Sequence, residues 1–93
     1  MAHITGGGIT ENLPRVLPEG CGAVVDPRAW VVPSLFRMLQ ERGGIASDEM
    51  FRTFNMGIGM TLVCARESRD DVMRALPDAR VIGTVVRGVG VAY

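Results

Sequence analysis

Three consecutive glycines near the start of the chain form the segment best suited to bind a ligand. Gly6, Gly7 and Gly8 carry no side chains, so a ligand can approach their backbone N–H groups closely. A polar stretch that could open a helix follows, and a helix start carries a partial positive charge. Such a loop can cradle a phosphate group. The alternative is a tight turn that needs positive φ angles, which glycine adopts without steric cost.

The glycine run fits neither of the two common phosphate-binding patterns. It lacks the Lys-Ser/Thr ending of the P-loop and the spacing of the dinucleotide fingerprint. The pairs Gly57-x-Gly59 and Gly88-x-Gly90 fail both patterns as well, and we expect them to be strand glycines or bulges. From the residues alone, both the phosphate cradle and the tight turn remain open.

Polar side chains flank the glycines. Thr5 would add a hydroxyl donor to a bound phosphate, and Arg15 a charge-assisted contact. Glu11 suits a phosphate site poorly because its carboxylate would repel the ligand. We expect it to contact Mg²⁺ or a substrate amino group, or to cap the helix. For Glu11, Asn12 and Arg15 together, the alternative is capping and a solvated face.

Asn55 precedes a long apolar run and could reach the same cleft from a strand end, where ligands often bind in such sheets. The sequence identifies no catalytic residue, and we expect no metal site within the chain. The predicted substrate- and phosphate-binding residues are Thr5, Gly6, Gly7, Gly8, Glu11, Asn12, Arg15 and Asn55.

The single histidine and the two cysteines do not suggest a catalytic or zinc site. Zinc needs clustered ligands such as Cys-x-x-Cys, whereas Cys21 and Cys64 lie far apart in the sequence. Both have apolar neighbours, so we expect buried thiols in a reduced protein. His3 has no Gly-x-Ser-x-Gly nucleophile motif to serve, and we expect it to be a hydrogen-bonded structural residue.

Length and charge exclude several classes of protein. The 93 residues make one domain or part of one. Ten basic residues balance ten acidic ones, so the basic excess typical of nucleic-acid binding is missing. All ten are arginine, which leaves no lysine for a Schiff base or a phosphate loop. No apolar run reaches the ~18 residues of a membrane span. We expect a soluble, cytoplasmic domain without nucleic-acid or membrane partners.

Proline, glycine and hydrophobic spacing predict the elements that hold these residues. Pro14 and Pro18 limit any helix after the glycines to about one turn. Strands are predicted at 21–25, 58–65, 80–86 and 88–92. A helix is predicted from 32–34 to Gly43-Gly44, with Leu35, Phe36 and Leu39 as its apolar side. A short helix capped by Ser47 should place Met50, Phe51 and Phe54 in the core, and a further helix should be capped by Ser68-x-x-Asp71 and stopped by Pro77.

The apolar run from Ile58 to Ala65 predicts a central strand that is covered on both faces. Strand, helix and strand from 58 to 86 fit a right-handed crossover unit. The pattern as a whole predicts a mixed β-sheet with flanking helices, of α+β or α/β type, and we expect the α+β class.

Three blocks of sequence resemble the phosphoribosylformylglycinamidine cyclo-ligase family, also called aminoimidazole ribonucleotide synthetases. They are His-Ile-Thr-Gly-Gly-Gly at 3–8, Glu-Asn-Leu-Pro-Arg-Val-Leu-Pro at 11–18 and Phe-Arg-Thr-Phe-Asn-Met-Gly-Ile-Gly-Met at 51–60. Their spacing and the intervening helix that begins at Pro33 are also similar. The resemblance therefore covers nearly the whole chain, and related synthetases carry different residues around the glycine loop.

The resemblance implies an ATP-dependent ligase of de novo purine biosynthesis. Family members use ATP and Mg²⁺ to phosphorylate the formyl amide oxygen of formylglycinamidine ribonucleotide. The amidine nitrogen then displaces phosphate and closes the ring of aminoimidazole ribonucleotide. They are homodimers of two-domain subunits, with much of the ATP and metal site in the N-terminal half. Residues 1–93 resemble most of the C-terminal domain, without that ATP-binding half.

Two other functions stay open: a non-catalytic anion-binding or interaction domain, and the matching domain of a related enzyme such as formylglycinamidine ribonucleotide synthetase. Phosphoryl transfer needs metal ions and charge stabilisation on the γ-phosphate, and the chain has no lysine for that task. We therefore expect the 93 residues alone to lack cyclo-ligase activity. We also expect an exposed apolar surface that promotes self-association.

Overall fold

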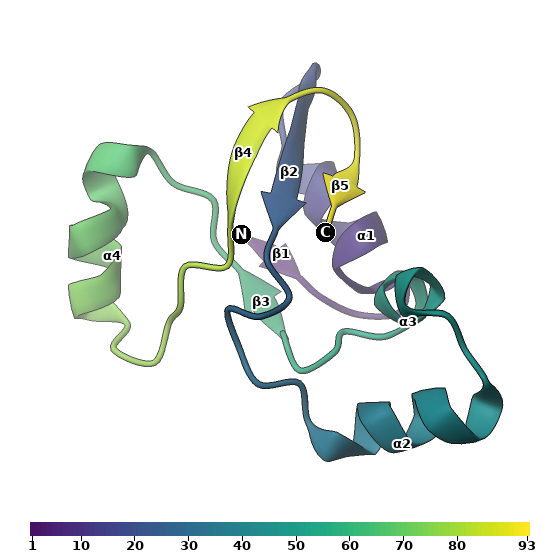
Figure 1. Cartoon of the computed structure of the whole chain (residues 1–93). Helices are drawn as coiled ribbons and strands as arrows, with labels where there is room; N and C mark the ends of the chain where they lie inside the picture. Colours follow the sequence, from purple (N-terminus) through teal and green to yellow (C-terminus); the bar gives the residue numbers. More distant parts are fainter.

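Two small β-sheets and four α-helices make up the fold in the computed structural model, which describes residues 1–93 (Figure 1). In chain order the elements are β1 (Ala2–His3), α1 (Gly8–Asn12), the 3₁₀ helix η1 (Leu13–Val16), β2 (Cys21–Val25), α2 (Ser34–Gly43), α3 (Ser47–Thr53), β3 (Met60–Thr61), the 3₁₀ helix η2 (Arg66–Ser68), α4 (Arg69–Ala75), β4 (Gly83–Arg87) and β5 (Val91–Ala92). The predicted α+β class, with mixed strand directions and flanking helices, is confirmed.

Strand β2 is the centre of the larger sheet, whose order is β4-β2-β5. It pairs antiparallel with β4 and parallel with β5. Ala23 and Val25 are buried on one face, while Val24 between them is exposed. A Cβ at Gly83 would overlap the carbonyl oxygen of Val24, so glycine allows β4 to approach β2 closely. The strand predicted at 21–25 is confirmed.

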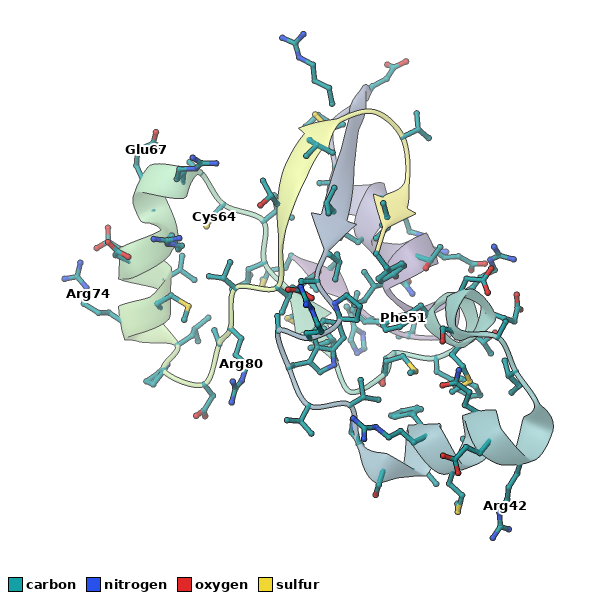
Figure 2. All side chains as sticks on the ribbon, viewed as in Figure 1. Arg42, Phe51, Cys64, Glu67, Arg74 and Arg80 are labelled. Atoms are coloured by element: carbon teal, nitrogen blue, oxygen red, sulfur yellow. The ribbon has the colours of Figure 1, made fainter.

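The hydrophobic core lies between this sheet, β1 and the helices α1 and α3. Its ten buried members are Ala2, Ile4, Ile9, Leu13, Ala23, Val25, Trp30, Met50, Phe51 and Met56. The indole N–H of Trp30 donates to the carbonyl oxygen of Met56 over 3.0 Å. Figure 2 shows Phe51 in the interior. Its ring meets that of Trp30 edge-on, with centroids 6.3 Å apart. Met50 and Phe51 are core residues as predicted, and Phe54 is half-buried.

Helices α2 and α3 follow the prediction closely. Gly44 ends α2 in the left-handed conformation, with φ of 60°. On the expected apolar side only Phe36 packs against the core, whereas Leu35 and Leu39 are exposed. Ser47 is the first residue of α3 and not its cap, which is Ala46. None of the helices has the length and apolar character needed to cross a membrane.

The central strand predicted at 58–65 is wrong. Only Met60–Thr61 forms a strand, and it pairs antiparallel with Ala2–His3 alone. A strand persists only where a neighbour accepts and donates its backbone hydrogen bonds, and β1 offers two residues. Leu62, Val63 and Cys64 are therefore exposed. Cys64, predicted to be buried, lies on the open segment that leads to α4 (Figure 2).

The crossover unit predicted from 58 to 86 is also wrong, because β3 and β4 belong to different sheets. The intervening α4 stands apart from both sheets (Figure 1) and has no buried residue. The expected capping box at its start does not form, since Ser68 makes no side-chain capping bond. Asp71 instead pairs with Arg74 over 2.9 Å. With no sheet behind it, α4 leaves its apolar residues Val72 and Met73 only half-buried.

The last two predicted strands are present but displaced or shortened. Residues 83–87 replace the predicted 80–86, and 91–92 replace 88–92. The paired glycines expected in strands or bulges lie outside strands. Gly57, Gly88 and Gly90 have positive φ angles, which suit turns and bends.

Candidate functional site

The glycine loop lies between β1 and α1 and is anchored to two neighbouring segments. The N–H of Ile4 donates to the carbonyl oxygen of Gly59 over 2.9 Å, and the N–H of Gly7 to that of Thr53 over 3.4 Å. Within the loop, the N–H of Gly8 donates to the carbonyl oxygen of Thr5 over 3.0 Å. The loop is thus held against the end of α3 without any ligand.

Two of the three glycines have the positive φ that the tight-turn interpretation requires, 95° at Gly7 and 60° at Gly8. A Cβ at Gly8 would overlap the carbonyl oxygens of Phe51 and Phe54. Glycine at this position therefore lets α1 pack directly on the backbone of α3. Around Gly6, in contrast, a Cβ would meet no atom within 4 Å.

The loop has two backbone N–H groups that donate no hydrogen bond to any atom of the chain. Thr5 and Gly6 are exposed, and neither backbone amide makes a hydrogen bond within the chain. The amides of Gly7 and Gly8 are already occupied. A bound anion would consequently meet the N–H groups of Thr5 and Gly6 first.

Asn12 is buried, with 4% of its surface exposed, and its side chain faces the glycine loop. Its Nδ2 donates to the carbonyl oxygens of Gly8 over 2.8 Å, Gly6 over 3.2 Å and Thr5 over 3.4 Å. Its Oδ1 accepts from the Thr5 hydroxyl over 3.4 Å and from Arg15 Nη1 over 3.3 Å. Asn12 is therefore an internal brace of the loop, with its hydrogen-bonding groups engaged.

Glu11 and Arg15 are the exposed charged residues that follow the loop. The Glu11 carboxylate lies over Gly7, at the place where a Cβ would project. Glu11 makes no side-chain hydrogen bond or ion pair within the chain, so no hydrogen bond supports the capping role. Arg15 has no ion-pair partner and reaches only the side chain of Asn12. Neither side chain forms an ion pair within the chain.

Asn55 shapes the turn that follows α3. Its Oδ1 accepts a hydrogen bond from the N–H of Gly57 over 2.9 Å, across residues with positive φ at Met56 and Gly57. The turn directly follows Phe54, whose carbonyl oxygen lies against Gly8. The structure thus brings the segment of Asn55 next to the glycine loop, with its side chain engaged in the turn.

The donor set in the chain does not fit a magnesium or zinc ion by itself. No three or more His, Cys, Asp or Glu side chains gather closely enough to hold a metal. Cys21 and Cys64 are both free thiols. His3 is exposed and makes no side-chain hydrogen bond, so the expected structural role for it is wrong.

Thr10 and Tyr93, which the sequence patterns did not single out, contact each other through their hydroxyl groups. The hydroxyl of Thr10 in α1 lies 2.9 Å from the hydroxyl of Tyr93. They are 83 positions apart in the sequence. No local pattern could have connected them, because their contact depends on where β5 ends in the folded chain.

A shallow groove of about 540 Å³ lies at the end of β2, away from the predicted site residues. Its polar lining includes Asp26, Arg28 and Thr84. The backbone N–H of Arg28 donates to Asp26 Oδ1 over 2.9 Å, and its Nε donates to the same atom over 3.2 Å. These bonds hold the pKa of Asp26 below its usual value. The pair closes a turn and leaves Arg28 in solvent.

Comparison with known proteins agrees with the resemblance carried by the glycine loop and its neighbours. All of the chain, residues 1–93, matches the family described as AIR synthase related protein, C-terminal domain. The chain is 47% identical over 97 residues to proteins named phosphoribosylformylglycinamidine cyclo-ligase from Bacillus licheniformis and Bacillus thuringiensis subsp. konkukian. The match covers 100% of this chain and 28% of each relative, so the chain spans about 28% of their length. It therefore belongs to the AIR synthase related protein family, as a C-terminal domain.

Proposed function

We propose that this chain forms the substrate- and phosphate-facing part of a phosphoribosylformylglycinamidine cyclo-ligase of de novo purine biosynthesis. The reaction converts formylglycinamidine ribonucleotide to aminoimidazole ribonucleotide with ATP. The observation that carries this proposal is the 47% identity over the full chain to enzymes of that name. The placement of the glycine loop adds a physical basis for binding a phosphorylated substrate.

The loop is suited to bind a phosphate because Asn12 orients its peptide units. In a trans peptide the C=O and N–H groups point in opposite directions. Asn12 Nδ2 and the N–H of Gly8 both hold the carbonyl oxygen of Thr5 on the inner side. The N–H of Gly6, in the same peptide unit, is thereby directed outward. We propose that this group and the N–H of Thr5 bind the substrate phosphate.

The exposed charged residues complete the proposed site. Arg15 would turn from Asn12 toward the phosphate and form a charge-assisted contact. The Glu11 carboxylate, which lies over Gly7, would move aside and contact an amino group of the substrate. Gly7 keeps the approach open because it has no side chain. Asn55 would form the neighbouring wall of the cleft through the turn it holds.

ATP and Mg²⁺ belong to the same proposal, and we place both mainly on the part of the enzyme that corresponds to the rest of the relatives' length. The chain has no lysine and no acidic cluster that could hold a divalent cation. The ion would supply charge neutralisation on the transferred phosphate. We therefore expect no activity from the 93 residues alone. A homodimer in the cytosol completes the proposal.

A chimeric enzyme tests this function. The aligned 97-residue segment of the Bacillus licheniformis relative is replaced by this chain. The chimera is expressed in a purine auxotroph that lacks the cyclo-ligase, and the purified protein is assayed for ATP-dependent formation of aminoimidazole ribonucleotide. We expect growth without purines and measurable turnover. The same relative with the segment deleted is the negative control.

A chimera that folds but does not turn over formylglycinamidine ribonucleotide would overturn the proposal. Circular dichroism and gel filtration establish folding independently of activity. In that case, retained binding of ribose 5-phosphate would favour the non-catalytic anion-binding domain. Turnover of formylglycinamide ribonucleotide with glutamine would favour the related synthetase.

A further inference from the structure

The hydroxyl of Thr10 joins three segments that are far apart in the sequence. Its Oγ1 donates to the carbonyl oxygen of Phe51 in α3 over 3.3 Å and lies 2.9 Å from the Tyr93 hydroxyl. A threonine has a single hydroxyl proton. With that proton given to the carbonyl oxygen of Phe51, the Tyr93 hydroxyl donates to Thr10. One small side chain therefore connects α1, α3 and the residue after β5.

The ring of Tyr93 is held in place by Phe51. Their centroids are 4.4 Å apart and their planes are inclined by 32°, close to an offset stack. Phe51 is buried and meets Trp30 edge-on. Partial burial raises the pKa of Tyr93, which remains 42% exposed. The phenol thus keeps its proton at neutral pH and can act as the donor.

The contact lies directly behind the glycine loop. Helix α1 begins at Gly8, the last residue of the glycine loop, and Thr10 is its third residue. The carbonyl oxygen of Phe51 accepts the Thr10 hydroxyl and also lies where a Cβ at Gly8 would project. The five residues of α1 are too few to form a stable helix by themselves. The orientation of α1, and of the loop that precedes it, therefore depends on such tertiary contacts.

We infer that Tyr93 is a positioning residue, which acts through Thr10 to fix α1 and to aim the N–H groups of Thr5 and Gly6 at a phosphate-bearing ligand. The inference rests on the proposed function of the glycine loop. Neither hydroxyl needs to touch the ligand. Loss of the Tyr93 hydroxyl removes the bond that ties α1 to the residue after β5, and loss of the Thr10 hydroxyl also removes the bond to α3. Either loss loosens α1, so the free N–H groups of Thr5 and Gly6 meet a phosphate less often in the required geometry.

Three substitutions in the chimeric enzyme test the contact. Tyr93→Phe keeps the ring on Phe51 and removes the hydroxyl, Thr10→Val removes the bridging hydroxyl, and Thr10→Ser retains it. We expect the first two to raise KM for formylglycinamidine ribonucleotide about three- to tenfold, the range for one hydrogen bond, with a much smaller change in kcat. Thr10→Ser should keep the KM of the parent chimera, and the double variant of Tyr93→Phe with Thr10→Val should be no worse than Thr10→Val, which already removes both hydrogen bonds. Thr84→Val, an exposed hydroxyl without a hydrogen bond, is the control.

Hydrogen–deuterium exchange tests the same contact without catalysis. We expect faster exchange of the peptide covering residues 4–12 in Tyr93→Phe and Thr10→Val, with unchanged exchange in β2. Ribose 5-phosphate should protect that peptide in the parent chimera and protect it less in the two variants. If Thr10→Val does not fold, Tyr93→Phe alone carries the test.

The possible outcomes separate the inference from the proposed function. An inactive chimera in which ribose 5-phosphate still protects the peptide, and protects it less in Tyr93→Phe, overturns the proposed enzyme and supports the positioning role. An active chimera whose KM is unchanged in Tyr93→Phe overturns the positioning role, whether or not exchange changes. A chimera in which ribose 5-phosphate gives no protection and which has no activity overturns both.

Discussion

The side-chain amide of Asn12 donates to the carbonyl oxygen of Gly8 over 2.8 Å, and both residues are buried. The same Nδ2 faces the carbonyl oxygens of Thr5 and Gly6. The shape of the glycine loop is therefore imposed by a side chain of the same domain. A loop that is already ordered loses less conformational entropy when a ligand binds, which favours affinity.

The two asparagines near the loop differ in their hydrogen bonds, because Asn12 donates through Nδ2 and Asn55 only accepts through Oδ1. This difference can be tested. Asn12→Asp replaces the donor that faces three carbonyl oxygens with a buried carboxylate. We expect it to lower the free energy of unfolding by about 1–3 kcal/mol, since one carboxylate oxygen would face the three carbonyl oxygens without a donor, while Arg15 and the Thr5 hydroxyl still reach the other oxygen. Asn55→Asp is the matched control, because Asn55 uses only Oδ1 as an acceptor. Its effect should stay within about 0.5 kcal/mol.

Urea denaturation of the parent chain and of the two variants measures these effects. The loss for Asn12→Asp should be smaller near pH ~4, where the carboxyl group is partly protonated and can again donate. Equal losses for the two substitutions would show that Asn12 does not brace the loop.

Neighbouring glycines should respond very differently to alanine. Gly8→Ala places a Cβ against two carbonyl oxygens at a residue with φ of 60°. We expect a loss of about 3 kcal/mol or more. Gly6→Ala has open space and no positive φ, so its effect should lie within about 1 kcal/mol. Thermal unfolding followed by circular dichroism distinguishes the two, and similar melting temperatures would contradict the close packing of α1 on α3.

Arg15→Ala should weaken ligand binding while folding is kept. Arg15 is exposed and bonds only to Asn12 Oδ1, so its removal costs little packing. A charge-assisted contact with phosphate corresponds to about 1.5–3 kcal/mol of binding free energy. Calorimetric titration of the chimera with formylglycinamidine ribonucleotide measures the loss. Arg87→Ala, also exposed, is the control. If Arg15→Ala lowers only the melting temperature, Arg15 has a structural role.

The stability of the domain should fall in alkaline solution through Tyr93. Its pKa is raised in the folded state, chiefly by burial. Above about pH 10 the unfolded chain releases the phenolic proton more readily than the folded chain, so the free energy of unfolding decreases as pH rises. Tyr93 is the single tyrosine, and the chain has no lysine to titrate in the same range. Tyr93→Phe should reduce this fall in the free energy of unfolding, which urea denaturation between pH 8 and pH 11 measures. Identical stability profiles of the parent and the variant would show that Tyr93 does not cause the fall.

The open segment after β3 should promote self-association of the 93-residue chain. Met60, Leu62 and Val63 are exposed by 56%, 42% and 40% on a segment with one short strand partner. Such apolar strand edges readily pair with another chain. Sedimentation should show association that grows with concentration and that Leu62→Glu weakens. Val89→Glu, at a 97% exposed position between β4 and β5, should leave the association unchanged. A chain that stays monomeric at high concentration would contradict the prediction.

Local patterns in the sequence were sufficient for several features of the fold. Strand β2 is bounded by turn residues on both sides, and α2 ends at Gly44, as predicted. Pro14 lies in the first turn of the short 3₁₀ helix that follows the single turn of α1. These signals act within a few residues, because proline and glycine restrict or release the backbone at their own positions. The blocks around the glycine loop also indicated the family that the whole chain matches.

Only the tertiary structure decided which groups face one another. The run from Ile58 to Ala65 is as apolar as a central strand, yet its backbone pairs over two residues because β1 supplies no more partners. Asn12 could be a ligand donor by type, but the folded loop places three carbonyl oxygens around its amide. Thr10 and Tyr93 meet across 83 positions. Strand pairing and the satisfaction of buried polar groups depend on residues distant in the chain, and local sequence patterns do not record those distances.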